Sequence, residues 1–342
     1  KDMFTNGKVS GNIVMYAIQK SNSGTIDDSG FSINSIGLAY ETAEFNGFKS
    51  SFSFRGNNKI YEVEDGDYAD DEAPKAIIDT ANISYSNKYF TVIAGRQAIS
   101  LEWVEDYHEA YVASITTIPN TIILVAHTNR TAVADTDDVL KVFRQVNENR
   151  GANIIDIKYA GIDSLALNAY YYNAPDLANW YGTKVDYDTD MIGATLHYAA
   201  SKEEVATTKD GSVFAAELRA KMNAFSANLG YIITDKDGAI GSMRLVGESI
   251  NPLEENHNQV YTTDANTIYL GLGYKLDDFS LNAMYGSTKY ASYKQDEINL
   301  IAEYGINDEF TVGTIFVNVN TDDTTLSYND YNTISLTISY AF

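Results

Sequence analysis

Apolar and polar residues alternate one by one along much of this chain, with the period of an extended strand. At the C-terminus, Ile334, Leu336 and Ile338 alternate with Thr333 and Ser335. The same alternation recurs in the segments 48–55, 225–233, 279–286 and 297–304. Because a period of two places every second side chain on the same face, each segment predicts a β-strand with one apolar and one small or polar face.

The connections between these strands alternate between short and long. The short set is 44–47, 87–88, 119–120, 161–163, 223–224, 277–278 and 306–308. The long set is 58–75, 98–106, 130–151, 203–211, 235–265 and 319–330. Seventeen strands are evident, and the aromatic residues within 176–189 add an eighteenth. An even number returns the last strand to the side on which the first begins, as a barrel made from one chain requires.

Alternation alone does not separate a membrane barrel from a soluble β-sandwich. The polar faces carry Gly, Ser, Asn and charged residues together, which suits a water-filled interior. Tyrosine recurs where apolar faces end, at Tyr171, Tyr231, Tyr285, Tyr304 and Tyr340, as an aromatic girdle at the lipid headgroups requires. We therefore predict an all-β fold: a transmembrane antiparallel β-barrel of 18 strands with short periplasmic turns and long extracellular loops. A soluble sandwich or propeller is the competing fold, although no blade-length repeat supports it.

The barrel is expected to form one domain over residues 1–342, since no shift in composition marks a second. Only the segment 136–149 has a helical spacing of apolar residues, and we expect a short helix there inside an extracellular loop. In hydrocarbon, strands span only as a closed sheet, because every backbone N–H and C=O must be paired internally. A barrel of sixteen to eighteen strands is too wide to be filled by its own wall side chains, so it encloses an aqueous channel.

Composition narrows the class of protein further. The chain has 24 basic and 47 acidic residues, a formal net charge of −23, and no cysteine. Nucleic-acid binding is disfavoured because it needs clustered Lys and Arg, and disulfides and thiolate chemistry are excluded. No run of 18 apolar residues predicts a membrane-spanning helix. The start of the chain lacks a basic and apolar leader, so we expect a bacterial outer-membrane protein that crossed the periplasm and has already lost its signal peptide.

Three short segments carry a family resemblance: the opening segment 4–11, the segment 94–97 that runs into 101–103, and the tyrosine-rich segment 167–176. They resemble the corresponding parts of OprD-like porins from campylobacterial outer membranes. The last four residues, 339–342, look like the signature by which the outer-membrane insertion machinery recognises its clients. The resemblance implies an 18-stranded barrel whose third extracellular loop folds inward to form the constriction. Some members of that family bind calcium and form trimers.

In this chain the corresponding third loop is 98–106. The candidate constriction residues are Arg96, Glu102, Glu105, Asp106 and His108, with Arg130 across the next hairpin. Facing acidic and basic walls would set a transverse field that sorts solutes by charge. The resemblance also implies a ladder of arginines opposite the acids, to which Arg55, Arg96, Arg130 and Arg219 would contribute. The chain holds only seven arginines, so such a ladder would be thin. The alternative interpretation is a loop with ordinary solvated charges.

One loop is dense in acids and is a candidate for calcium binding. Its hard oxygen donors are Asp65, Asp67, Asp70, Asp71 and Glu72, although they lack an EF-hand spacing. A plain solvated loop at the channel mouth is the competing interpretation. The four histidines are scattered and no Gly-x-Ser-x-Gly motif occurs, so we expect no enzyme. An outer-membrane phospholipase needs no such motif and remains the alternative among enzymes.

We conclude from the sequence that the chain is a porin for passive diffusion of small hydrophilic solutes and ions. The excess of acid favours cations or neutral solutes. The competing function is a surface adhesin or receptor barrel that acts through its extracellular loops. The expected partners are outer-membrane lipid, lipopolysaccharide, solutes and ions, with a homotrimer as the alternative to a monomer.

Overall fold

The computed structural model describes residues 2–68, 73–255, 258–328 and 330–342. Nineteen strands in this part of the chain belong to one antiparallel sheet. Their bounds are β1 (Lys8–Asn22), β2 (Ser29–Glu41), β3 (Phe48–Glu62), β4 (Ala76–Ser86), β5 (Phe90–Ala98), β6 (Tyr107–Ile115), β7 (Thr121–Val133), β8 (Lys141–Gln145), β9 (Ala152–Ile162), β10 (Leu165–Ala174), β11 (Ala178–Asp188), β12 (Ile192–Glu203), β13 (Ser212–Met222), β14 (Phe225–Thr234), β15 (Asn266–Leu276), β16 (Phe279–Tyr290), β17 (Tyr293–Gly305), β18 (Phe310–Thr321) and β19 (Tyr331–Ala341).

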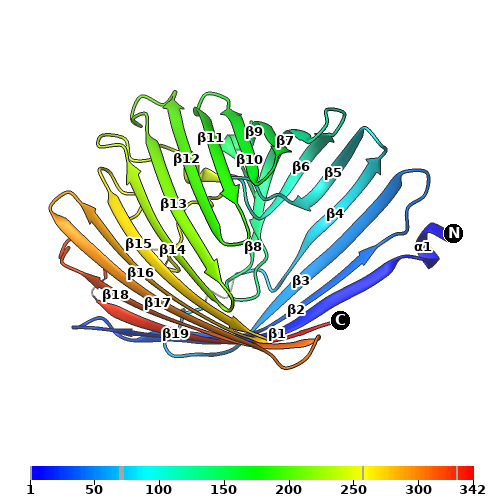
Figure 1. Cartoon of the computed structure of the whole chain (residues 1–342). Helices are drawn as coiled ribbons and strands as arrows, with labels where there is room; N and C mark the ends of the chain where they lie inside the picture. The colour runs from blue at the N-terminus through cyan, green and yellow to red at the C-terminus, as the bar shows by residue number, and fades with distance from the viewer. Residues whose placement is uncertain (1, 69–72, 256–257, 329) are drawn as a thin grey trace.

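Eighteen of these strands form the wall of a closed barrel, as predicted. Each pairs with its neighbour in the chain, β7 pairs directly with β9, and β1 closes the barrel against β19. Figure 1 shows β1 and β19 side by side. The nineteenth strand, β8, is a short strand paired with β7 inside the loop that follows it. The eighteenth wall strand predicted within 176–189 is β11.

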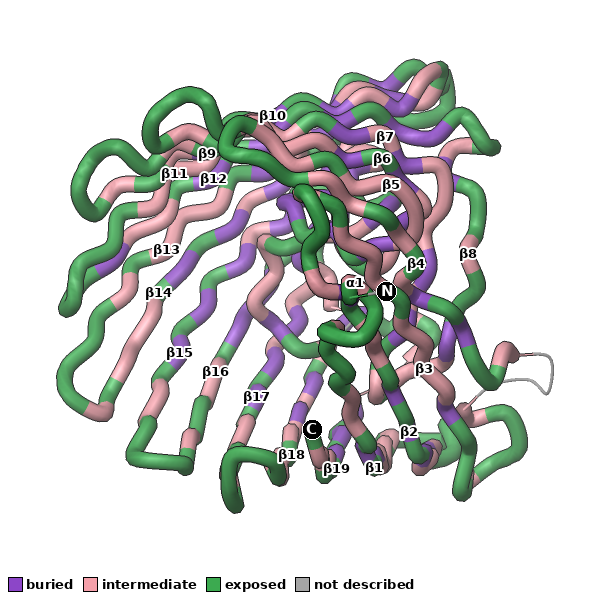
Figure 2. Tube along the Cα trace, turned by 90° about the vertical axis from the view of Figure 1, so that its right-hand side faces the viewer, coloured by how far each residue is buried: buried purple, intermediate pink, exposed green. Residues whose placement is uncertain are grey.

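The alternation in the sequence becomes an alternation of faces. On β19, Ile334 and Leu336 are exposed, whereas Thr333 and Ser335 are buried. The burial colours change from residue to residue along the strands in Figure 2. Because the apolar side chains point away from the interior, the barrel presents them to lipid and turns its small and polar side chains inward.

The short connections are tight turns built on residues that tolerate a left-handed backbone. Asn46, Asn120, Asn223 and Asp277 all have positive φ in the predicted short set, a conformation that Asn and Asp adopt more readily than other non-glycine residues. The predicted strict alternation of loop lengths is wrong at two places. The connections 175–177 and 291–292 are also tight, although they lie on the side of the long loops. They are short because the neighbouring strands, β10 to β12 and β16 to β17, remain paired up to their ends.

The helix predicted for 136–149 is also wrong. This segment holds β8 and a short 3-10 turn, η1 (Asn147–Asn149). Its apolar residues serve two different contacts rather than one helix face, since Leu140 packs with Ile77 and Ala132 while Val146 joins another cluster. The described helices are the four-residue α1 (Asp2–Thr5), η1 and the short 3-10 turn η2 (Met243–Leu245), and none is long and apolar enough to cross a membrane.

Residues 134–151 (here L4), the loop that contains β8, cover a part of the wall where strand pairing ends before the extracellular rim. β4 and β5 pair only between Ala81–Ser86 and 91–96, so the wall above them is incomplete on the extracellular side. L4 crosses this gap to β3, where the Asn57 amide donates to the backbone carbonyls of Asp135 and Asp138 at 3.0 and 2.9 Å.

Candidate functional site: the inward loops

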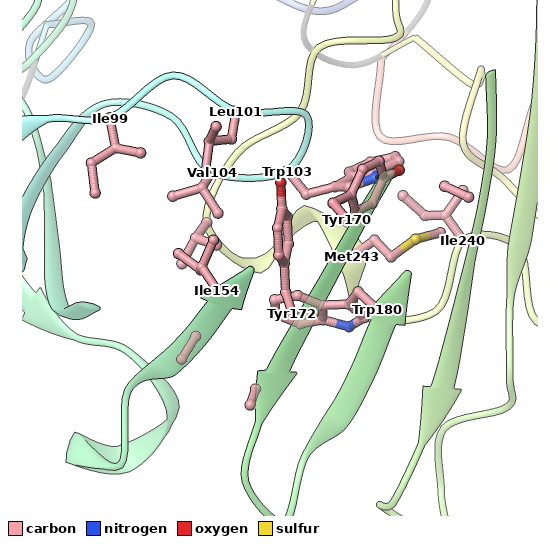
Figure 3. Close-up of a cluster of buried hydrophobic side chains, with 14 of the residues drawn as sticks. Ile99, Leu101, Trp103, Val104, Ile154, Tyr170, Tyr172, Trp180, Ile240 and Met243 are labelled. Carbon is pink, nitrogen blue, oxygen red and sulfur yellow. Dashed lines mark hydrogen bonds between the residues drawn. The ribbon is translucent and has the colours of Figure 1, made fainter. Parts of the chain in front are cut away.

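The third extracellular loop, residues 99–106 (here L3), packs against the inner face of the barrel wall. Its Trp103 is fully buried, and the indole Nε1 donates to Tyr170 Oη on β10 at 2.8 Å. Figure 3 shows Trp103 above Tyr170, Tyr172 and Trp180, which rise from β10 and β11. The burial of these large rings away from the aqueous interior holds L3 against one wall.

A second loop also folds inward, which the sequence did not indicate. Residues 235–265 (here L7) bring Ile240 and Met243 into the same apolar cluster. The Trp180 Nε1 donates to Ser242 Oγ at 3.0 Å. L7 therefore lies inside the barrel beside L3 rather than extending into the medium.

L3 and L7 contact each other through one backbone–backbone hydrogen bond and one bond from a backbone N–H to a side-chain carboxylate. The Glu105 N–H donates to the Val246 carbonyl at 2.9 Å, and the Glu248 N–H donates to Glu105 Oε2 at 3.1 Å. Between them Gly247 has a φ of 137°, and a Cβ there would lie 2.6 Å from the Glu105 nitrogen. Only glycine fits this position, because the conformation and the close approach both exclude a side chain.

Glu102 is the central charged residue of the junction. Its carboxylate accepts hydrogen bonds from Lys184 Nζ on β11 at 3.1 Å and from Ser249 Oγ of L7 at 2.8 Å. His197 on β12 lies 3.7 Å away. Burial alone would raise the pKa of Glu102, but the charge of Lys184 and these hydrogen bonds hold that pKa below its ordinary value.

The junction lies between two water-accessible cavities. On the extracellular side, a cavity of about 610 Å³ is lined by L3, L4 and L7. Its five acids are Glu105, Asp106, Asp135, Asp138 and Glu248, and its three bases are Lys141, Arg144 and Arg244. On the other side, a cavity of about 370 Å³ has four acids, Glu102, Asp186, Asp188 and Glu217, against the bases Lys184 and Arg219. Acid exceeds base by two charges in each.

Three loop carboxyls of the extracellular cavity, those of Glu105, Asp106 and Asp135, have raised pKa values. Burial, followed by the neighbouring Asp106, Asp137 and Asp138, raises the pKa of Asp135 to about 6. Burial also raises the pKa of Glu105. For both groups, partial removal from water and the nearness of like charges disfavour the ionised carboxylate. The charge of this cavity therefore depends on pH near neutrality.

His108, one of the predicted constriction residues, is fully buried in the base of L3. Its two ring nitrogens are hydrogen-bonded to Thr128 Oγ1 at 2.8 Å and to the Glu105 carbonyl oxygen at 2.7 Å. The side chain therefore joins β6, β7 and L3 and does not line either cavity.

Arg219 and Arg55 both point into the barrel, from different walls. Arg219 on β13 contacts Asp188 at 3.1 Å and Glu217 at 2.9 Å and lines the smaller cavity. Arg55 on β3 donates to Asn12 Oδ1 at 3.2 Å and to Ser35 Oγ at 2.8 Å. Only Arg219 is close to the junction of L3 and L7.

Arg96 and Arg130 lie on the other face of the wall. Both are opposite Glu109 in the sheet, and Glu109 is two residues from the strongly exposed Tyr111. Directly paired residues share a face, as do residues two apart on one strand. The two arginines therefore lie on the outward face, opposite to His108.

The candidate calcium loop is only partly described, since Asp70, Asp71 and Glu72 lie outside the described residues. Asp67 uses Oδ2 to accept hydrogen bonds from the Gly30 and Glu64 N–H groups at 2.8 and 2.9 Å. Asp65 is exposed. Within the described part of the chain, no three His, Asp or Glu side chains gather in a way that would hold a metal ion.

The residues that sequence reasoning missed are Lys184, His197 and Ser249. Strand alternation alone places Lys184 on the same face as Asp186, which was an available signal. Its contact with Glu102, 82 positions earlier, depends on the register of β11 and on the inward path of L3. Ser249 carried no signal, because it belongs to a loop that the sequence places outside.

Comparison with known proteins agrees with this architecture. The family model described as Gram-negative porin matches residues 6–341. No curated protein matches the chain significantly.

Among solved structures, OpdO of Pseudomonas aeruginosa is similar with a TM-score of 0.83 and 13% identity, over 100% of this chain and 98% of that one. OccAB4 of Acinetobacter baumannii has a TM-score of 0.81 and 13% identity, over 98% of each chain. OccK8 (OprE) of Pseudomonas aeruginosa has a TM-score of 0.80 and 13% identity, over 100% of this chain and 99% of that one. At these identities the likeness shows the shared fold, that of the Occ and OprD porins. With the family match across nearly its whole length, the chain belongs to the Gram-negative porins, which are non-enzymatic channel proteins of the outer membrane.

Proposed function

We propose that this porin is an open diffusion channel for small hydrophilic solutes and ions, narrowed by L3 and L7, with a preference for cations. The observation that carries the proposal is the excess of acid over base on both sides of the L3–L7 junction. Fixed negative charge along a narrow aqueous path raises the local concentration of cations and lowers that of anions.

The constriction in this proposal is formed by Glu102, Glu105 and Asp106 of L3, with Arg219 on the periplasmic side of the junction. Arg55, on a separate part of the wall, contributes the facing positive charge. The contact of Glu102 with Lys184 and Ser249 supports it, because these bonds fix the carboxylate in position. Arg96, His108 and Arg130 stay outside the proposed constriction because of the faces and contacts described above.

Reversal potentials in planar bilayers under a potassium chloride gradient test the proposal. The wild-type channel is expected to give a cation-biased potential. The double variant Glu105→Gln, Asp106→Asn should move this potential toward zero, whereas Glu44→Gln, in an exposed periplasmic turn, should change it little. An anion-biased wild-type potential would refute cation preference, and equal effects of the two variants would refute the placement of the constriction.

The alternative of an adhesin or receptor barrel acts through the extracellular loops, among them residues 235–265. In the structure this loop packs against L3 and the barrel wall. Shortening it is therefore expected to increase single-channel conductance. A shortened barrel with unchanged conductance that no longer attaches to its surface partner would favour the alternative.

Three finer points belong to the same proposal. The short segments that resemble campylobacterial OprD-like porins support a closer kinship with that branch. Trimer formation is proposed from the same resemblance, and cross-linking in detergent followed by mass measurement tests it. The lipopolysaccharide partner is proposed on separate grounds below.

A further inference from the structure

The outward face of the wall changes from apolar to polar between two successive rows of paired residues. These rows lie on β7, β9, β10 and β11. One row of directly paired residues is exposed and apolar or aromatic: Val125, Ile155, Tyr171 and Tyr181. The next row toward the extracellular side consists of His127, Asn153, Asn173 and Asn179. Polar side chains without partners are costly in hydrocarbon, so this step marks the extracellular limit of the apolar band.

The polar row is joined into one hydrogen-bonded chain of side chains, here called the amide belt. His127 Nδ1 is bonded to Asn153 Oδ1 at 2.9 Å, and the Asn153 amide donates to Asn173 Oδ1 at 3.3 Å. The Asn173 amide donates to Asn179 Oδ1 at 2.8 Å, and the Asn179 amide donates to Glu204 Oε1 at 3.0 Å. The belt therefore presents a continuous line of amide groups across four wall strands.

Outward tyrosines support this placement of the membrane boundary. Tyr171 Oη donates to Asn179 Oδ1 at 2.6 Å, and Tyr231 Oη donates to Asn266 Oδ1 at 2.7 Å on another part of the wall. In each pair the ring faces lipid and the hydroxyl reaches a polar group, as tyrosines do at the headgroup level. The belt thus lies beside the headgroups of the outer leaflet.

Two arginines stand at one end of the belt, on the same outward face. Arg96 Nη2 lies 2.9 Å from Glu109 Oε1, and Arg130 Nε lies 3.7 Å from Glu109 Oε2. Two guanidinium groups share one carboxylate, which leaves one net positive charge. The Arg130 side chain is 42% exposed and its contact with Glu109 is longer than a hydrogen bond, so Glu109 does not take up its donors.

We propose that Arg96, Arg130 and the amide belt bind the headgroup of a phosphorylated glycolipid of the outer leaflet, that is, lipopolysaccharide. A guanidinium matches the geometry and charge of a phosphate. The neighbouring amides donate to and accept from sugar hydroxyls. A site of this kind at the extracellular end faces the glycolipid leaflet, whereas a phosphate site on the periplasmic rim would face phospholipid. The inference rests on the outer-membrane location and not on the proposed ion preference.

Native mass spectrometry of the detergent-purified barrel, titrated with bisphosphorylated lipid A, tests the proposal. Arg130→Gln is expected to weaken binding about tenfold, the effect of losing one charge-assisted contact. Arg219→Gln, which removes a guanidinium from the inside of the barrel, is the matched control and should not change lipid A binding. Asn153→Ala with Asn173→Ala should weaken binding by a smaller factor.

Two further binding measurements distinguish recognition of lipid A phosphate from binding of free inorganic phosphate. Wild-type protein should bind dephosphorylated lipid A about as weakly as Arg130→Gln binds the bisphosphorylated form, and inorganic phosphate at equal concentration should not compete. Equal binding of lipid A by wild type and Arg130→Gln overturns the proposal, as does full competition by inorganic phosphate. Conductance is an independent readout, so a barrel that conducts but does not bind lipid A contradicts this inference and leaves the proposed function standing.

Discussion

Two parts of the inner wall differ in what they do with the same strand alternation. Around Tyr172 and Trp180 the inward side chains are aromatic and fully buried, because L3 and L7 cover them. Around Arg55 the inward neighbours are Asn12 and Ser35, joined by hydrogen bonds. Large inward rings on a wide barrel therefore mark where a loop packs, and short polar side chains mark a wall that accepts water and ions.

The largest effect is expected from removing the ring that joins L3 to the wall. Trp103→Ala should cost about 3–5 kcal/mol of unfolding free energy, as buried Trp truncations do, and should increase single-channel conductance because L3 is no longer held. Leu336→Ala, on the lipid face, should leave conductance unchanged. Thermal unfolding and bilayer recordings check both, and wild-type conductance in Trp103→Ala would contradict the role of this cluster.

A smaller effect is expected at the ion pair of the junction. Lys184→Met leaves the Glu102 carboxylate largely buried without its cation, and an unpaired buried group of this kind costs about 1–3 kcal/mol. Thermal unfolding measures the loss. The double variant Lys184→Met, Glu102→Gln should recover part of it, and a double variant no more stable than the single one would argue against direct coupling.

On the polar part of the wall around Arg55, a substitution is expected to change stability little and ion selectivity clearly. Arg55→Gln should alter the free energy of unfolding by about 1 kcal/mol or less, since its hydrogen bonds are exchanged for bonds to water. Removal of the positive charge should strengthen cation preference in reversal-potential measurements. Strong destabilisation would show that this wall also depends on tight packing.

The smallest effect is a dependence of selectivity on pH. With its pKa near 6, Asp135 is ionised at pH 7.5 and mostly neutral at pH 5. The extracellular cavity therefore loses negative charge as pH falls, and cation preference should decrease across this interval. Asp135→Asn should remove this part of the pH dependence and leave the rest. An identical pH profile in the variant would assign the titration to other groups.

The segment 136–149 and the outward-facing Arg96 are two features that local sequence patterns do not specify. Apolar residues in 136–149 have a helical spacing, but Leu140 and Val146 pack into different clusters, so the spacing reflects two tertiary contacts. Arg96 is next to Gln97, which faces the interior as the partner of His108. A step of one residue along a strand changes the face, and only the register shows which residue of such a pair points inward.

By itself the sequence determined the all-β class, the 18 wall strands and most turns. These features follow from local rules, because strand period, turn residues and the need to pair every backbone group in lipid act within or between neighbouring segments. The tertiary structure alone decided that L7 lies inside, that Glu102 meets Lys184 and Ser249, and that the amide belt is continuous. These contacts join residues far apart in the chain, and their geometry exists only once the barrel is closed and the register is set.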